Sequence, residues 1–152
     1  MNAVYEGDGS TQRLVPFTDV RMLRRMLRDA RHRNHSPLRT ILHWHYVRSG
    51  ELFSIVPLRG LADVIIDGGF PFELPALKPY FSQDDGMLPR ATDFEDYTGF
   101  VDARIRFNRI QSILGTVEGM SLESTRDTNL IPGDAVLREF IGSSTIKIPH
   151  NE

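Results

Sequence analysis

The stretch that says most about the fold of this chain is residues 18–33, TDVRMLRRMLRDARHR. Its apolar residues recur every three or four positions, which is the spacing of a helix with one buried face. Thr18 or Asp19 can cap the first turn of such a helix. We therefore predict a helix over residues 20–32. The four apolar residues that carry the pattern are Val20, Leu23, Met26 and Leu27.

Arginine fills most of the other positions of this helix. Arg21, Arg25 and Arg28 follow i, i+4, i+7 spacing and share one face, and Arg24 and Arg31 form a second stripe. Like charges at this spacing repel one another, so an anion between them would relieve the repulsion. A phosphate-binding face is one interpretation. The other is a solvated basic face whose arginines pair with nearby aspartate and glutamate side chains.

The composition makes this local cluster stand out. The net charge is −2, yet 16 of the 18 basic residues are arginine and eight of those lie within the first 39 residues. Arginine meets phosphate or carboxylate oxygens with a rigid planar fork, whereas lysine is a flexible point charge. The chain has no cysteine, which excludes a disulfide framework and a cysteine-ligated zinc site. We expect a cytoplasmic protein, because no apolar run is long enough to span a bilayer and residues 1–9 do not resemble a signal peptide.

Further elements follow from local patterns. Ser36 and Pro37 can begin a second helix that runs to about Val47 and ends at Ser49-Gly50. Residues 53–57 could form a short strand. The apolar run of residues 62–66, ADVII, predicts a strand buried on both faces, as in a parallel sheet. The sequence supplies no other convincing strand–helix–strand unit to build that sheet.

The remaining helices are predicted from the same spacing rules. We expect a short helix interrupted by Pro75 and Pro79 over residues 72–81, a long helix over 93–114 and a short one over 135–140. Residues 119–131 read as loop. The apolar residues expected to form the buried stripe of the long helix are Phe94, Tyr97, Val101, Ile105, Ile110, Ile113 and Leu114.

Three kinds of site receive little support. His43 and His45 are two positions apart and point to different sides of a helix, so we predict no metal site. The P-loop pattern G-x-x-x-x-G-K-[ST] is absent, and Gly7 and Gly9 begin no such motif. A nucleic-acid partner would need a broader basic surface with stacking aromatics beside it, and we do not expect one. We expect no membrane partner either.

The arginine stretch does resemble a known family. Residues 18–33 are similar to the lid of the uridine kinase and phosphoribulokinase family of P-loop kinases, and the similarity continues to residues 62–66, which look like that family's final parallel strand. Residues 131–142, which include Leu137-Arg138-Glu139-Phe140, resemble the end of longer bacterial uridine-kinase-like proteins. The resemblance covers most of residues 16–82 and 131–142. Asn34 replaces the usual glycine after the last lid arginine, and His35 stands where relatives often have another arginine.

The resemblance carries expectations about chemistry. Family members phosphorylate uridine, cytidine or a sugar phosphate from a Mg-bound nucleoside triphosphate, so ATP and Mg would serve the complete enzyme, with neither bound tightly here. It implies that Arg28 and Arg33 contact the transferring phosphates as catalytic residues. It further implies that a nucleotide or phosphate anion is held by a second set of residues: Arg21, Arg24, Arg25, Asp29 and His35.

These expectations combine into one interpretation. We expect a mostly helical α+β chain that forms the C-terminal portion of a P-loop α/β kinase fold with an incomplete sheet, and that is inactive alone. It would comprise a flexible N-terminal arm (1–17), a body of lid helices, strand and C-terminal helices (18–118) and a tail with a short helix (119–152). The alternatives are a stand-alone phosphate- or nucleotide-binding regulatory module and a fragment that completes a partner. That partner would be the missing P-loop domain or a second copy in a homo-oligomer.

Overall fold

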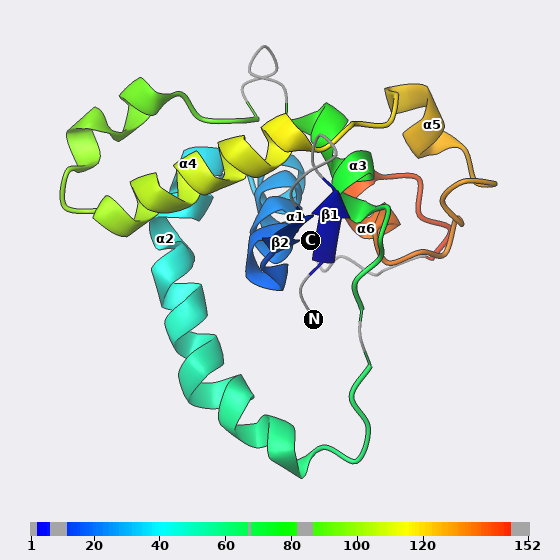
Figure 1. Cartoon of the computed structure of the whole chain (residues 1–152), viewed down its shortest axis with the longest axis horizontal. Helices are drawn as coiled ribbons and strands as arrows, with labels where there is room; N and C mark the ends of the chain where they lie inside the picture. The colour runs from blue at the N-terminus through cyan, green and yellow to red at the C-terminus, as the bar shows by residue number, and fades with distance from the viewer. Residues whose placement is uncertain (1–2, 7–11, 67, 82–86, 147–152) are drawn as a thin grey trace.

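A computed structural model describes residues 3–6, 12–66, 68–81 and 87–146, and it is mostly helical (Figure 1). This confirms the mostly helical part of the predicted fold class. Within the described residues the sheet structure consists of one antiparallel pair, β1 (Ala3–Glu6) with β2 (Gln12–Val15). The parallel sheet of a P-loop kinase has no counterpart in the described part of the chain.

The two strands differ from the flexible arm predicted over residues 1–17. They pair in the register Ala3 opposite Val15 and Glu6 opposite Gln12. Residues 7–11, whose glycines favoured an arm without strands, lie outside the described residues. The strand pair was missed because the glycine- and polar-rich composition of the segment dominated the pattern.

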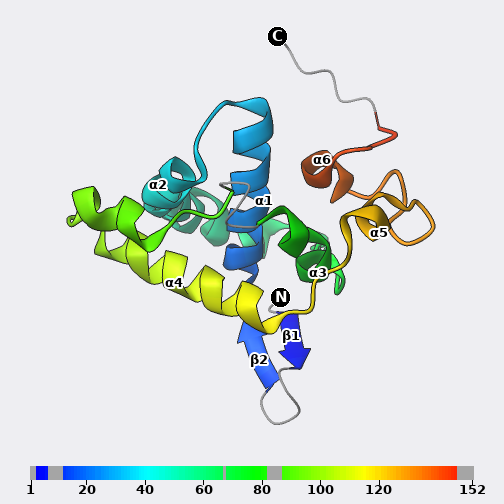
Figure 2. The ribbon, with the colours of Figure 1, turned by 90° about the horizontal axis from the view of Figure 1, so that it is seen from above.

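Helix α1 (Phe17–His32) lies at the centre of the molecule and confirms the predicted helix, although it begins three residues earlier. Pro16 is its N-cap, so neither Thr18 nor Asp19 caps it. The apolar stripe is completely or nearly completely buried, and α1 contacts α2, α3 and α6 (Figure 2). Because the stripe supplies the middle of the core, the polar face of α1 is fixed in place relative to its neighbours.

Helix α2 (Pro37–Gly50) begins as predicted, with Ser36 Oγ accepting a hydrogen bond from the Arg39 N–H at 3.2 Å. The α-helix ends at Gly50, as predicted. Gly50 nevertheless keeps helical torsions, with φ −57° and ψ −40°, so it provides no left-handed stop. The backbone continues as a π-helical segment (Glu51–Ile55) and a 3-10 helix (Val56–Leu61). The possible strand over 53–57 is therefore wrong.

Residues 62–66 do not form the predicted strand. They form an irregular segment, with a bend at Asp63, that returns from the end of the α2 helical arm toward α3 (Figure 1). Every residue from 62 to 66 is exposed, and Ile66 reaches 87%. The β-branched pattern favours a strand, but no described strand lies beside it to pair with its backbone.

The rest of the chain closes the core around α1. Helix α3 (Glu73–Leu77) and the 3-10 turn Lys78–Tyr80 confirm the interrupted short helix over 72–81. The predicted long helix is split into a 3-10 segment (Ala91–Tyr97) and α4 (Val101–Thr116).

The buried stripe of the long helix also differs from the prediction. Tyr97, Val101 and Ile105 are exposed, contrary to the predicted stripe. Ala103 and Phe107 take their place in the core beside the correctly predicted Phe94, Ile110, Ile113 and Leu114. Within α4 the buried residues follow helical spacing from Ala103, which leaves Val101 and Ile105 on another face of the helix.

The C-terminal segment contributes to the core. It forms α5 (Leu122–Arg126) within the predicted loop and α6 (Arg138–Ile141) within the predicted last helix. Helix α6 packs against α1, more than 100 residues away in sequence, and the Arg31 Nη1 donates to the Phe140 carbonyl at 2.8 Å. Leu137, Phe140 and Ile141 are buried.

Candidate functional site

The arginine face of α1 lines a cavity of about 140 Å³. Four arginines of α1 surround it, the indole of Trp44 and the side chain of Val47 come from α2, and Phe140 comes from α6. Three helices therefore build the site, and α6 reaches it from more than 100 residues further along the chain. The four arginines are Arg21, Arg24, Arg25 and Arg28.

Asp29 lies beside this cavity and is the acceptor for three guanidinium groups. Its side chain is buried, with 3% of the residue exposed. Arg25 Nε approaches Oδ2 at 3.2 Å, Arg28 Nη2 approaches Oδ1 at 3.0 Å, and Arg33 Nη1 approaches Oδ1 at 3.5 Å. One carboxylate thus orients three arginines without neutralising them.

Arg24 is the most deeply placed of the cavity arginines. Its Nε donates to Glu73 of α3, and its Nη2 donates to the other Glu73 oxygen at 2.6 Å and to the Gly68 carbonyl at 3.0 Å. Its guanidinium carbon also lies 5.7 Å from the centre of the Phe140 ring. These contacts tie α1 to α3 and hold this guanidinium in one orientation at the cavity wall.

Arg21 shares a second carboxylate with an arginine of α2. Arg21 and Arg48 both pair with Glu51, which is buried where α2 passes into its π-helical continuation. The Arg21 side chain is still about one-third exposed. The continuation of α2 past Gly50 therefore places Glu51 where it can reach α1.

The charges of this cluster do not cancel. Six arginines pair with only three carboxylates, so the cluster carries an excess of three positive charges. Each interpretation of the arginine pattern describes part of this arrangement. The arginines have acidic partners, as in a paired basic face, and positive charge is left over, as in a phosphate-binding face. Such an excess beside a small cavity favours an anion. The arginines are Arg21, Arg24, Arg25, Arg28, Arg33 and Arg48, and the carboxylates are Asp29, Glu51 and Glu73.

The predicted site residues divide into three groups. Arg21, Arg24, Arg25 and Arg28 line the cavity, while Arg33 and Asp29 adjoin it through their ion pair. His35 is not among the cavity-lining residues. Its backbone N–H donates to the backbone carbonyl of Asp29 at 3.1 Å. Sequence reasoning missed Glu51, Glu73 and Phe140, because each is distant from α1 in the chain.

No set of three histidine, aspartate or glutamate side chains is arranged to hold a metal among the residues that the structure describes. The Nδ1 atoms of His43 and His45 lie 2.9 Å from the carbonyls of Arg39 and Leu42, within the preceding turn of α2. The arginine cluster is chemically suited to phosphate oxygens and would repel Mg. Any Mg of a complete kinase would have to be held by other residues.

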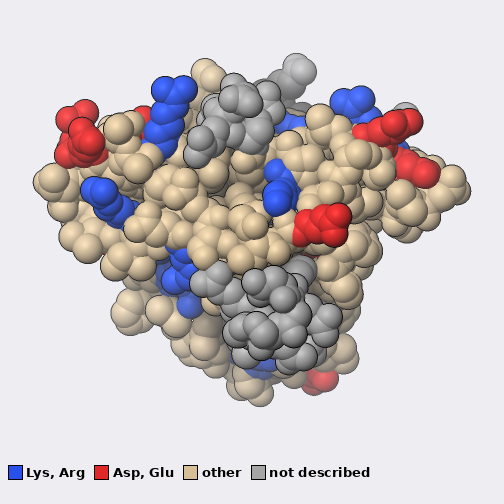
Figure 3. Space-filling view, turned by 45° about the horizontal axis from the view of Figure 1, so that its top comes forward, with Lys and Arg blue, Asp and Glu red and all other residues tan. Residues whose placement is uncertain are grey.

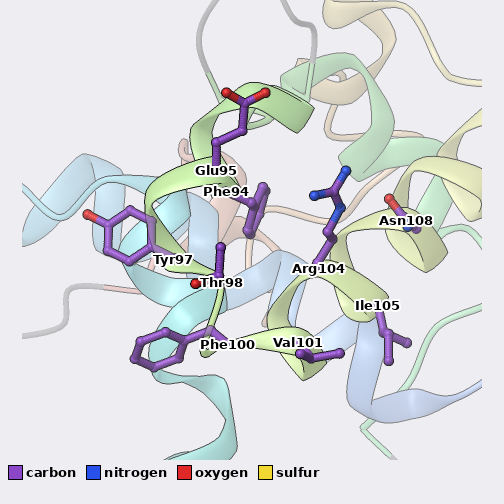
Figure 4. Close-up of a pocket in the computed structure, with 9 residues that line it drawn as sticks. All are labelled: Phe94, Glu95, Tyr97, Thr98, Phe100, Val101, Arg104, Ile105 and Asn108. Carbon is purple, nitrogen blue, oxygen red and sulfur yellow. The ribbon is translucent and has the colours of Figure 1, made fainter.

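A larger cavity of about 460 Å³ lies between the 3-10 segment Ala91–Tyr97 and α4 (Figure 4). Its walls are mostly apolar, and Glu95 and Arg104 approach it from different elements. None of the predicted site residues lines it. It offers one cation where the arginine cavity offers four, so the arginine cavity is the stronger candidate for an anion.

The surface and the comparisons add three findings. The face in Figure 3 shows basic and acidic side chains scattered singly among uncharged ones, without a continuous basic field. Among the described residues no helix has the length and apolar character needed to cross a membrane.

No protein-family model, curated protein or solved structure matches the chain.

Proposed function

We propose that the arginine cavity on α1 binds a phosphate group of a nucleotide. The observation that carries this proposal is that the four arginines lining the cavity outnumber the three carboxylates that pair with them, and that Arg33 and Arg48 add two more positive charges on the same carboxylates. Guanidinium groups bind phosphate oxygens through paired, charge-assisted hydrogen bonds, which are roughly twice as strong as neutral ones. A bound phosphate would relieve the repulsion among the arginines that Asp29, Glu51 and Glu73 leave uncompensated.

The size of the cavity indicates which part of the ligand enters it. Small-molecule sites are typically about 300–1,000 Å³, and this cavity has about 140 Å³. It accommodates a phosphate group, and the nucleoside would lie outside it. The side chains of Arg21 and Arg25 line the cavity and are each about one-third exposed. They can therefore contact both the solvent and the ligand.

We further propose that this binding serves an ATP-dependent uridine, cytidine or sugar kinase for which the chain supplies the arginine lid. Support comes from the resemblance of residues 16–82 and 131–142, and from the meeting of those two segments at one cavity. Phosphoryl transfer depends mainly on positioning and on neutralising charge on the phosphoryl oxygens, which is chemistry that arginine provides. Such a protein would act in the cytoplasm. Without a P-loop in its sequence, the chain would not catalyse the transfer alone.

A stand-alone nucleotide-binding module is the second candidate, and the preformed geometry favours it. The cavity arginines are already held by buried carboxylates, and α1 is embedded in the core. An assay of ATP-dependent uridine phosphorylation separates the two candidates from an autonomous kinase. We expect no turnover by the chain alone, and clear turnover would contradict the lid proposal.

The binding site itself is tested by calorimetric titration with sulfate, UMP and ATP. We expect saturable binding of all three, tighter for the nucleotides, and at least about tenfold weaker binding in Arg25→Ala or Arg28→Ala, because each substitution removes a charge-assisted contact of more than about 1.4 kcal/mol. Arg104→Ala is the matched control, since Arg104 is an exposed arginine of the other cavity. Absence of binding, or an equal loss in Arg104→Ala, would overturn the proposed site.

A further inference from the structure

An exposed apolar arm forms the most unusual surface of this protein. All fifteen residues from 52 to 66 are exposed, across the end of the π-helical segment, the 3-10 helix and the irregular segment that follows. The arm extends away from α1 and the rest of the core (Figure 1). Its large apolar residues that are at least half exposed are Leu52, Phe53, Ile55, Val56, Leu58, Leu61, Val64, Ile65 and Ile66.

The apolar area that the arm exposes is larger than the apolar patches that monomeric proteins usually expose. A large apolar residue carries on the order of 200 Å² of surface, so these nine present roughly 1,000 Å² together. The largest apolar patch of a typical monomer covers about 300–600 Å². A standard protein–protein interface buries about 800 Å² on each partner. The whole arm, residues 52–66, therefore exposes about the area of one side of such an interface, and Val64, Ile65 and Ile66 carry about a third of it.

Residues 63–66 at the end of the arm also have unused backbone groups. Their N–H and C=O groups make no backbone hydrogen bond with other described residues, whereas the N–H of Ala62 donates to the Arg59 carbonyl. Three of these four residues are β-branched, which favours an extended strand. An exposed segment whose backbone groups are unpaired in this way can pair with a strand of another chain once it straightens at the bend of Asp63.

We propose that the occupant of this surface is a second copy of the chain, with residues 62–66 of the two copies paired antiparallel about a twofold axis. Full overlap of the two segments centres the axis on Val64, places Ala62 opposite Ile66, and leaves Asp63 opposite Ile65. No like charges face each other in this register. The only charged residues of the arm are Arg59 and Asp63, so two arms meet without net repulsion.

This proposal does not rest on the phosphate site, because the arm residues do not line the arginine cavity. Sedimentation and light scattering should give a mass near twice 17.3 kDa that falls on dilution. Hydrogen exchange should show every second amide of residues 62–66 protected in the dimer and unprotected after dilution, because alternate N–H groups of an antiparallel pair point at the partner strand. A monomer across roughly a hundredfold range of concentration would assign the arm to a different polypeptide and overturn the proposal.

The register is tested with charge at its centre. Val64→Lys and Val64→Glu each place like charges opposite each other, so we expect each variant to be monomeric. A mixture of the two places lysine opposite glutamate, and we expect a heterodimer. Val64 is 75% exposed, so neither substitution removes a core contact.

Val136→Lys is the matched control, because Val136 is an exposed valine outside the arm at 53%. It should dimerise as the unmodified chain does. A dimer that persists in Val64→Lys would place the interface elsewhere and contradict the proposal, as would a mixture that stays monomeric. Sulfate binding should be unchanged in Val64→Lys, so failure of the phosphate site and failure of the dimer give different results.

Discussion

Arg138 has a structural role that no pattern in the sequence predicted. Its residue surface is 1% exposed, and it has no acidic partner among the described residues. Its guanidinium donates instead to four backbone carbonyls, at 3.0 Å to Thr125, 3.1 Å to Asp127, 3.3 Å to Pro132, and also to Ile131. One side chain therefore organises the loop between α5 and α6, because a planar fork with five donors can serve several acceptors at once.

Arg138→Met should lower the free energy of unfolding by about 3 kcal/mol, since it removes the donors and leaves buried carbonyls unsatisfied. Urea denaturation measures this difference. Arg126→Met is the control, because Arg126 lies on the same segment and is exposed. A loss of similar size in both variants would show that the carbonyl cluster is not the cause.

Residue-level predictions succeeded where the signal was local. Asn34 stands where the resembled family has glycine, and its φ of 51° lies in the left-handed region that asparagine tolerates. The arginine positions on one face of α1 were likewise given by helical spacing alone. The carboxylates that orient those arginines could not be found in this way. Arg24 and Glu73 are 49 positions apart, and no local pattern connects them.

At the scale of elements, a helix was predicted well where its own sequence contains a capping residue or a proline that marks its start. Ser36 and Pro37 gave the start of α2 because capping and proline preference act within one turn. The end of α2 at Gly50 was predicted as well, but the π-helical and 3-10 segments that follow it were not, because Gly50 only permits a stop and does not impose one. The strand predicted over residues 62–66 was wrong for a different reason. A strand forms only beside another strand, and a high β-propensity does not supply that partner.

Ser36→Ala should destabilise the protein by about 1 kcal/mol, because it removes the acceptor for the Arg39 N–H at the start of α2. Ser49→Ala is a matched control in the same helix, since Ser49 is exposed near its end. Thermal denaturation should show a lower Tm for Ser36→Ala and little change for Ser49→Ala. Equal Tm values for the two variants would mean that the cap does not stabilise α2.

At the scale of the whole molecule, the two ends of the described chain depend on each other. Helix α1 provides the centre of the core, and α6 covers one side of it, supplying Phe140 to the arginine cavity. No sequence pattern placed α6 there, because contacts across more than 100 residues follow from the packing of all intervening elements. The fold shows that these two segments, α1 and α6, are in contact.

A chain that ends at Val136 should therefore lose cooperative folding. It lacks three buried apolar side chains, those of Leu137, Phe140 and Ile141, and burial contributes about 2 kcal/mol for each. The sum of about 6 kcal/mol is comparable to the entire stability of a typical domain, about 5–15 kcal/mol. A chain that ends at Ile146 keeps every described residue and should unfold as the full chain does, by circular dichroism against temperature. If the shorter chain also unfolds cooperatively at the same temperature, α6 is dispensable, and the arginine cavity needs no contribution from the C-terminal segment.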